Sequence, residues 1–172
     1  KEGYWIEHKK GRLDIGNTRE HALGYYYVQE AASMIPPEVL EPKPGDRVMD
    51  MCASPGSKAS QIAQKMENKG LLIATDITGE RLAALGINQQ RTGVMNCVVT
   101  QVPGEKITGL DLDKILLDAP CSGTGTIRKS IKTIRMWNPQ MIKHIAGIQR
   151  KLLMNAITLA KPGGTIVYST CS

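Results

Sequence analysis

Five short apolar runs alternate with segments of helical periodicity, and this alternation constrains the fold of the chain most. The runs are RVMDM (47–51), LLIATD (71–76), CVVT (97–100), KILLD (114–118) and GTIVYST (164–170). Apolar residues recur at helical spacing over 56–67, 78–91 and 139–160. Strands that are apolar along most of their length are typical of parallel sheets buried on both faces. The sequence therefore predicts an α/β fold with a doubly wound, mostly parallel sheet.

The rest of the chain is read as a lead-in to this core. Residues 1–44 form a predicted N-terminal lead-in with a short helix from about Val28. We expect that helix to stop before Pro36-Pro37, because a proline disfavours helical geometry in the residue before it. Residues 45–172 form the predicted core, which we expect to be incomplete at its C-terminus, after strand five. No apolar run is long enough to span a bilayer, so we expect a cytoplasmic protein without membrane contact.

The charge is distributed unevenly along the chain. All 16 acidic residues lie before Ala119, whereas the segment from Ala119 onwards is basic, and the net charge is +6. This asymmetry suggests a polyanionic partner, most simply RNA, although a solvated basic face is the alternative. Trp137 either stacks on a base or, as we favour, is a half-buried core aromatic. The candidate phosphate contacts, three of which share a face if the segment is helical, are Arg128, Lys129, Lys132 and Arg135.

Four chemically active side chains lie at or just after the ends of four predicted strands. They are Cys52, Asp76, Asp118 and Cys171, on strands one, two, four and five. In a parallel sheet these carboxyl ends form one edge, and ligands bind where the strand order reverses. We therefore expect the four side chains to converge on one ligand site, although a polar residue that only marks a strand end would explain each one alone.

The loop after the first strand, MDMCASPGSKASQIA, favours a nucleoside cofactor. Gly56 and Ser57 let a ligand approach the backbone, and the following helix offers unpaired N–H donors. The loop contains neither GxGxxG nor GxxxxGK[ST], which disfavours a Rossmann oxidoreductase and a nucleoside triphosphatase. Asp76 is placed to accept hydrogen bonds from a ribose, unless it is only a turn residue. A nucleoside with an amino-acid tail fits both features, and S-adenosylmethionine is the obvious candidate.

The four cysteines form no CxxC pair and no cluster with histidine, so we expect no metal site. We expect no disulfide framework either, and we read Cys97 as a buried thiol. A thiolate can add to C6 of a pyrimidine, which makes C5 nucleophilic toward a methyl sulfonium. The block DAPC places Asp118 and Cys121 on one loop, which Pro120 stiffens. Inert packing of Cys121 and Cys171, and a turn-capping role for Asp118, are the alternatives.

The blocks DMCASPGSK, LLDAPCSGTG and YSTCS resemble the signature blocks of the Nop/Sun (Fmu-type) family of RNA cytosine-5 methyltransferases. GYYYVQEAASM resembles that family's block just before the core, and the blocks occur in the family's order over nearly the whole chain. The resemblance implies a Rossmann-like methyltransferase core. It also implies methyl transfer from S-adenosylmethionine to C5 of a cytosine in tRNA or rRNA, through a covalent bond between a cysteine and C6.

The resemblance also implies roles for individual residues. Cys171 would attack C6, Cys121 would help to release the methylated product, and Asp118 would contact the edge of the cytosine. Gln29 and Ser33 match positions in the pre-core block. The residues implied to bind the cofactor are Cys52, Ala53, Ser54, Pro55, Gly56, Ser57, Lys58, Asp76, Arg81 and Asp118.

Two departures from the family pattern keep a second hypothesis open. Thr100 and Gln101 stand where the family usually has an acidic residue that touches the adenine, and the chain stops one residue after Cys171. The alternative is a non-catalytic RNA-binding or scaffold protein that retains the methyltransferase fold.

Overall fold

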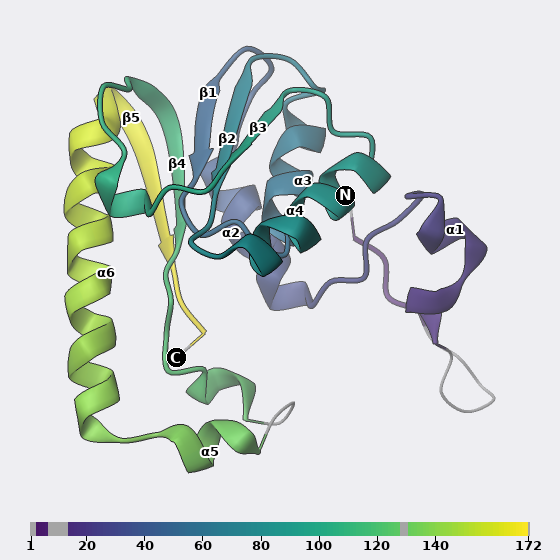
Figure 1. Ribbon diagram of the computed structural model, residues 1–172. Helices are drawn as coiled ribbons and strands as arrows, with labels where there is room; N and C mark the ends of the chain where they lie inside the picture. The colour runs from purple at the N-terminus through teal and green to yellow at the C-terminus, as the bar shows by residue number, and fades with distance from the viewer. Residues whose placement is uncertain (1–2, 7–13, 128–130, 172) are drawn as a thin grey trace.

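The computed structural model describes residues 3–6, 14–127 and 131–171, with five strands in one sheet (Figure 1). The strand order is β3-β2-β1-β4-β5, and every neighbouring pair is parallel. The order reverses between β1 and β4, because the chain builds β1 to β3 outward on one side and then returns to the centre. The predicted parallel α/β fold is confirmed. The strands are β1 (Arg47–Asp50), β2 (Leu71–Thr75), β3 (Cys97–Thr100), β4 (Leu112–Asp118) and β5 (Ala160–Ser169).

The three helices that connect the strands begin and end within two residues of the predicted segments. They are α3 (Ser57–Lys65), α4 (Gly79–Arg91) and α6 (Pro139–Leu159). Shorter elements precede the sheet or lie in its loops. These are the 3-10 helices η1 (Ile15–Asn17), η2 (Gly104–Lys106) and η3 (Thr124–Thr126), and the α-helices α1 (Arg19–Ala22), α2 (Ala31–Leu40) and α5 (Lys132–Met136).

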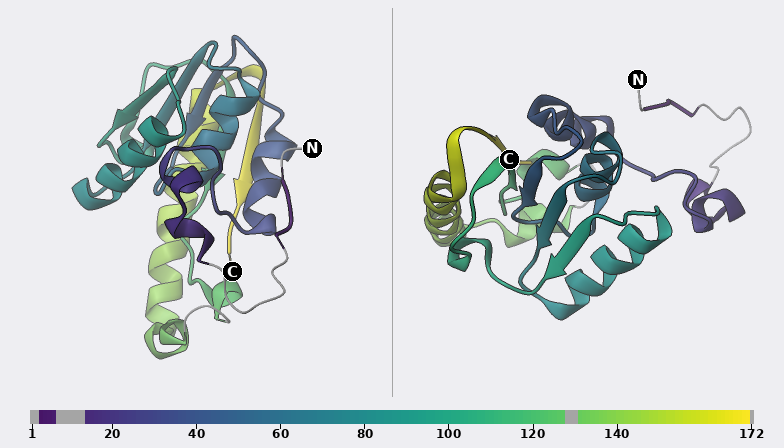
Figure 2. Two further views of the ribbon diagram at one scale, coloured as in Figure 1. Left: turned by 90° about the vertical axis from the view of Figure 1, so that its right-hand side faces the viewer. Right: turned by 90° about the horizontal axis from the view of Figure 1, so that it is seen from above.

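The central strands β1, β2 and β4 are buried on both faces, and successive residues of β1 and β4 point into different cores. Val48 of β1 packs in a cluster with residues of α2, α3 and α4, whereas its neighbour Met49 packs with residues of α6. Leu116 and Leu117 of β4 divide in the same way. This is the period of two expected of a strand, and it explains why both residues of each pair are apolar. Figure 2 shows the sheet and its helices from two further sides.

Helix α2 differs from the prediction, because it continues through Pro36 and Pro37 to Leu40. These three residues are the buried ones of the helix, and Leu40 belongs to the core cluster with Val48. Burial of the two proline rings and of Leu40 outweighs the local preference of proline for ending a helix. The helix also begins later than predicted, at Ala31 instead of about Val28.

Helix α6 is followed directly by the last strand, β5, with no loop between them. The Asn138 side chain caps the helix by accepting a hydrogen bond from the Met141 N–H at 2.8 Å, and Pro139 occupies the first helical position. The helix ends at Leu159 and β5 begins at Ala160, four residues earlier than predicted. Strand β5 then runs beside β4 to Ser169, so Cys171 lies two residues past its end. Within the described ranges, no helix has the length and apolar character needed to cross a membrane.

Because β4 lies inside the sheet, we expect truncation of a buried side chain on this strand to lower the free energy of unfolding strongly. Leu116 is fully buried, and its replacement in Leu116→Ala should lower the free energy of unfolding by about 2–5 kcal/mol. The matched control is Val98→Ala on the edge strand β3, where the side chain is 53% exposed and the change should cost only about 0.5 kcal/mol. Urea denaturation of both variants measures this difference, and equal losses would contradict the assigned strand order.

Candidate functional site

The loop after β1 reaches α3 through a backbone conformation that favours glycine. Gly56 has φ +105°, and a Cβ atom there would lie 3.0 Å from Cδ1 of Leu85. Gly56 is also the N-cap of α3, so no side chain caps the first turn of this helix. The N–H groups of that turn are therefore without a side-chain cap, and such a helix end favours a carboxylate or another anion.

Asp76 ties this loop to the end of β2, and its carboxylate is fully engaged. The side chain is 4% exposed and accepts hydrogen bonds from the N–H groups of Ser54 (3.1 Å) and Ile77 (2.8 Å). Arg81 donates from Nε at 2.7 Å and from Nη2 at 3.0 Å. These four bonds use the acceptor positions of the carboxylate, so a ribose hydroxyl would have to displace Arg81, whose side chain is 53% exposed.

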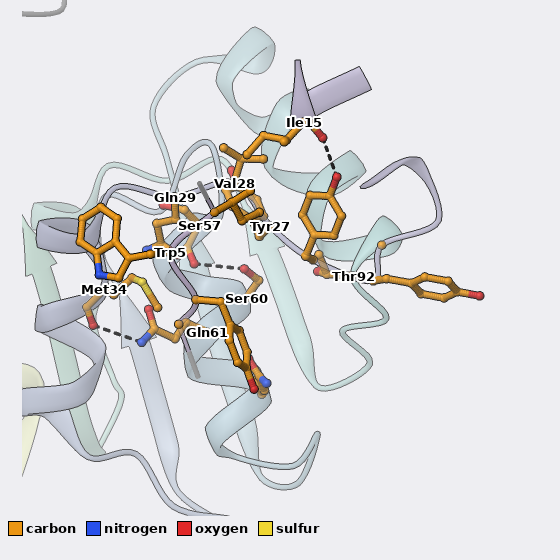
Figure 3. A pocket seen from close by; sticks show the side chains of 17 residues that line it. Trp5, Ile15, Tyr27, Val28, Gln29, Met34, Ser57, Ser60, Gln61 and Thr92 are labelled. Carbon is orange, nitrogen blue, oxygen red and sulfur yellow. Dashed lines mark hydrogen bonds between the residues drawn. The ribbon is translucent and has the colours of Figure 1, made fainter. Parts of the chain in front are cut away.

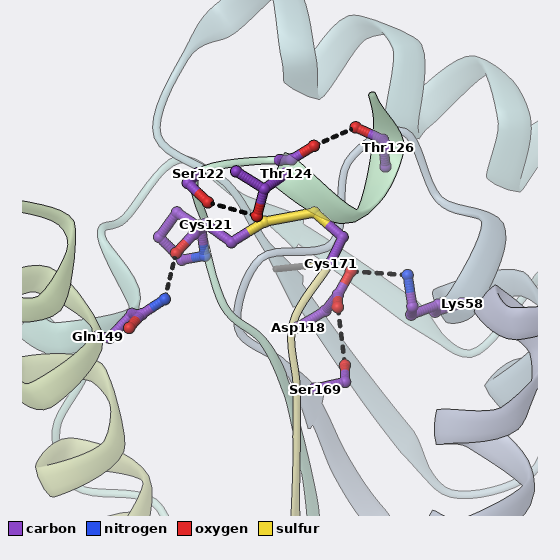
Figure 4. Close-up of a disulfide and its surroundings, with 11 residues drawn as sticks. Lys58, Asp118, Cys121, Ser122, Thr124, Thr126, Gln149, Ser169 and Cys171 are labelled. Carbon is purple, nitrogen blue, oxygen red and sulfur yellow. Dashed lines mark hydrogen bonds and ion pairs between the residues drawn. A yellow bond between two sulfur atoms is a disulfide. The ribbon is translucent and has the colours of Figure 1, made fainter. Parts of the chain in front are cut away.

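Asp118 joins α3 to the last strand at the same edge of the sheet. Its carboxylate lies 2.6 Å from Nζ of Lys58 and accepts a hydrogen bond from the Ser169 hydroxyl at 2.7 Å (Figure 4). The sequence pointed to Asp118 and Lys58 separately, but Ser169 was missed. Ser169 lies two residues before Cys171, and a period-two reading of the strand would have placed both on the same side.

Cys121 and Cys171 are joined by a disulfide, with their Cα atoms 6.3 Å apart (Figure 4). One disulfide is not the disulfide framework that the sequence disfavoured, but this pair was not expected, because that argument considered the cellular compartment and not the distance between neighbouring strand ends. The Cys171 carbonyl accepts a hydrogen bond from the Gly125 N–H at 2.7 Å. A Cβ atom at residue 125 would clash with that same carbonyl oxygen, so the loop after Cys121 packs closely on the end of the chain.

These contacts place Asp118, Cys121 and Cys171 together, and three carboxylates lie near Cys52 at the end of β1. Burial first, and then the nearby carboxylates of Asp50, Asp76 and Asp118, raise the pKa of the Cys52 thiol to about 12. Cys52 is therefore a neutral thiol near pH 7 and not a nucleophile. Cys97 is half-buried, not fully buried as predicted; it packs against the core cluster of α3, and burial raises the pKa of its thiol to about 12 as well.

Asp50, the last residue of β1, is a buried acid that was not among the site residues predicted from the sequence. It is 1% exposed; its Oδ1 accepts a hydrogen bond from the Cys52 N–H at 3.3 Å, and its Oδ2 has no hydrogen-bond partner. Burial, assisted by the negative charges of Asp118 and Asp76, raises the pKa of the Asp50 carboxyl to about 7. A carboxylate at the end of an otherwise apolar strand was the signal available in the sequence.

The structure covers only part of the predicted RNA-contacting segment. Arg128 and Lys129 lie outside the described residues. Lys132 begins α5, and Arg135 of the same helix is exposed. Trp137 is 51% exposed and belongs to neither core cluster, so the interpretation as a core aromatic is wrong. The reason is that α5 packs against η3 and not against the sheet.

Three other predicted positions lie outside this cluster of contacts. Gln101, at the end of β3, donates from its amide to the Ile77 carbonyl at 3.4 Å, next to Asp76. Gln29 lies in the wall of a separate cavity beside α3, and Ser33 lies in the first turn of α2. Among the residues that the structure describes, no group of three or more His, Cys, Asp or Glu side chains is arranged to hold a metal.

The raised pKa of Asp50 predicts a pH dependence of stability. The folded protein keeps this proton up to about pH 7, whereas the unfolded chain releases it near the ordinary value of 3.8. The folded state therefore binds more protons in this window, and the free energy of unfolding should fall as the pH rises from about 4 to about 7. Asp50→Asn removes this contribution, so its urea midpoint should fall less than that of the wild type between about pH 5 and about pH 8. Identical pH profiles for the two proteins would show that Asp50 titrates normally.

Comparison with known proteins identifies relatives of the chain. Residues 37–172 match the family described as 16S rRNA methyltransferase RsmB/F. The chain is 43% identical over 178 residues to ribosomal RNA small subunit methyltransferase F of Salmonella heidelberg (strain SL476), in an alignment that covers 99% of this chain. The same alignment covers 37% of that relative, so the chain spans little more than a third of its length.

Two solved structures from Pyrococcus horikoshii are similar in both fold and sequence. One is NSun6 with SFG, which has a TM-score of 0.86 and 38% identity over 94% of this chain and 42% of that chain. The other is a methyltransferase homolog protein with a TM-score of 0.83 and 42% identity over 94% of this chain and 51% of that chain. The match of the family over most of the chain, including both joined cysteines, shows that the chain belongs to the RsmB/F methyltransferases of the Nop/Sun family.

Proposed function

We propose that the protein carrying this chain transfers a methyl group from S-adenosylmethionine to C5 of a cytosine in ribosomal RNA. The description of the family as 16S rRNA methyltransferases favours rRNA over tRNA as the substrate. The observation that carries the choice of C5 is the contact between the sulfurs of Cys121 and Cys171 on the loops beside Asp118. The target cytosine would have to leave its stack, so we expect it in a loop or flipped out. We propose the cytoplasm as the location, since the substrate is part of the ribosome.

The residues around the first loop fit S-adenosylmethionine. The uncapped first turn of α3 suits the carboxylate of the methionine part, and Asp76 suits the ribose once Arg81 releases it. The solved NSun6 relative carries SFG, an analogue of S-adenosylmethionine, which supports this choice. When bound, the cofactor supplies an electrophilic methyl group. We assign its binding to residues 52–58, Asp76, Arg81 and Asp118, and RNA phosphate contact to Arg128, Lys129, Lys132 and Arg135.

The two thiols would supply the covalent chemistry. The Cys171 thiolate adds to C6 of the cytosine, which forms an S–C6 bond and moves electron density onto C5. C5 would then take the methyl group, and the electron pair of the broken S–CH3 bond would stay on the cofactor's sulfur, which leaves as a thioether. A base would then remove the C5 proton. The electrons of the C–H bond then form the C5–C6 double bond, and the S–C6 pair returns to the Cys171 sulfur. We assign Cys121 to this release step, and Asp118, held by Lys58 and Ser169, to the edge of the cytosine.

This mechanism requires the reduced form of the cysteine pair, because a sulfur in a disulfide cannot add to C6. A dithiol such as dithiothreitol converts the Cys121–Cys171 bond into two thiols and is itself oxidised to a disulfide. Every activity measurement below is therefore made in the presence of a dithiol.

Replacing the nucleophile should abolish the reaction. Cys171→Ser should reduce transfer of radiolabelled methyl groups from S-adenosylmethionine to 16S rRNA to background, because a neutral hydroxyl is a far weaker nucleophile than a thiolate. The control is Cys97→Ala, which removes a thiol packed against the core and should retain activity. Normal activity of Cys171→Ser would exclude the covalent route through this residue.

Removing the second thiol should trap the intermediate. Cys121→Ala should accumulate protein covalently bound to RNA, seen as a shifted band on a denaturing gel, because release stalls after C6 attack. The band should disappear in the double variant Cys121→Ala/Cys171→Ser. Normal turnover of Cys121→Ala without a shifted band would refute the assignment of Cys121 to release.

One observation favours the scaffold hypothesis as a second candidate. The position after β3 carries the amide of Gln101, which already bonds to the Ile77 carbonyl, and not a carboxylate. Titration calorimetry with S-adenosylmethionine separates the two functions. Binding supports the enzyme, whereas no heat of binding at millimolar cofactor supports a protein that keeps the fold without the chemistry.

A further inference from the structure

A cavity of about 780 Å³ lies between the N-terminal segment, the segment around residues 24–29 and helix α3 (Figure 3). The chain has two tryptophans, five tyrosines and no phenylalanine, and five of these seven aromatic residues line this one cavity. Aromatic side chains are the largest apolar groups available for packing, so we would expect most of them in the core of the sheet. Here most of them line a cavity outside that core. We call this feature the aromatic cavity; its aromatic residues are Tyr4, Trp5, Tyr25, Tyr26 and Tyr27.

Three of these rings are not used for packing. Tyr4 is 89% exposed, Trp5 is 88% exposed and Tyr25 is 75% exposed. The other two are fixed in place: the Tyr26 hydroxyl donates to the Ile15 carbonyl at 2.7 Å, and the Arg91 guanidinium lies 5.5 Å from the centre of the Tyr27 ring. The aromatic cavity thus combines anchored rings with rings whose faces are free to stack on a planar ligand.

The polar groups of the aromatic cavity are neutral. None of its described lining residues is Lys, Arg, Asp or Glu. Gln61 is 6% exposed, and its Nε2 donates to the Met34 carbonyl (3.1 Å) and to Glu38, while its Oε1 has no partner. Nε2 of Gln29 is also buried without a partner. Unpaired buried amide atoms are rare because they cost free energy, and a ligand that offers a donor and an acceptor would satisfy both.

The aromatic cavity adjoins the proposed site of methyl transfer. Ser57 lines the cavity and also belongs to the loop that we assign to the cofactor. The next residue, Lys58, lies 2.6 Å from Asp118, which we assign to the target cytosine. Figure 3 places Ser57, Gln29 and Gln61 between Trp5 and Met34 on one side and Tyr27 and Thr92 on the other. The aromatic cavity and the proposed site therefore share the first turn of α3, through the adjacent residues Ser57 and Lys58.

We propose that the aromatic cavity binds unpaired bases of the substrate RNA strand beside the target cytosine, by stacking on Trp5 and Tyr25. The inference rests on the proposed function and adds a substrate-binding subsite to it. Bases are neutral, planar, and rich in hydrogen-bond donors and acceptors, so they match a lining of aromatic rings, amides and hydroxyls. Phosphates and the charged methionine part of the cofactor do not match it, because the lining offers them no counter-charge. Stacking on aromatic side chains is how proteins commonly hold single-stranded nucleic acid.

The test measures RNA affinity with and without the exposed rings. The probe is a fluorescently labelled single-stranded RNA of about 12 nucleotides, compared with the same sequence in a duplex. Trp5→Ala and Tyr25→Ala should each weaken binding of the single strand by about tenfold and leave duplex binding unchanged. Trp5→Phe, which retains a ring, should restore most of the affinity. The salt dependence should stay the same in all variants, because no phosphate contact is removed. The matched control is Met95→Ala, an 82% exposed apolar residue outside the cavity.

A second measurement reports on the aromatic cavity directly. In a protein made of residues 1–172, Trp137→Tyr leaves Trp5 as the one tryptophan, and a stacked base should quench its fluorescence at the same RNA concentrations that saturate binding. Unchanged affinity of both alanine variants, or no quenching, would overturn the proposal. So would protection of Trp5 from acrylamide in the full-length protein without RNA, since a protein segment would then cover the cavity.

The failure of this proposal is distinguishable from failure of the proposed function. A protein that methylates RNA while Trp5→Ala and Tyr25→Ala bind it normally retains the function and loses the subsite. A protein that shows the stacking signal but transfers no methyl group retains the subsite and loses the function.

Discussion

The parallel pairing of β4 with β5 is the constraint on which the site depends. The register sets Asp118 opposite Ser169, and the Ala119 N–H continues the ladder to the Ser169 carbonyl at 2.9 Å. Because both strands run in the same direction and end at the same level, the residues just past them leave the sheet together. Cys121 and Cys171 are 50 residues apart in sequence, yet this register brings the segments that carry them together.

The fold could be predicted from the sequence because a strand that is buried on both faces is a continuous run of apolar residues, which is easily recognised. Val48 and Met49 belong to different cores, so a buried parallel strand must be apolar at every position. The two predictions that were wrong concern features that are determined by tertiary packing. Helix α2 passes its prolines because their rings are buried, and Trp137 stays exposed because α5 does not reach the sheet. Neither outcome is visible in a local pattern.

The sequence predicted which residues at the strand ends belong to the candidate site. It did not predict the hydrogen bonds and ion pairs between them. Asp118 and Lys58 were recognised separately, whereas their ion pair depends on where α3 places Lys58 relative to the end of β4. The complete engagement of Asp76 by Ser54, Ile77 and Arg81, and the unpaired oxygen of Asp50, depend on atoms contributed by several elements. The family resemblance supplied residue roles, while the contacts between those residues came only from the structure.

Gly125 shows how the two sulfurs are held in relation to each other. Its N–H bonds to the Cys171 carbonyl, and the space that a methyl group would need is already filled by that oxygen. The backbone of the loop after β4 thus packs directly against the backbone that follows β5, at a distance set by this hydrogen bond. Alanine, the smallest possible replacement, would already wedge the two backbones apart. The alignment of the thiols therefore depends on a residue that has no side chain and takes no part in the chemistry.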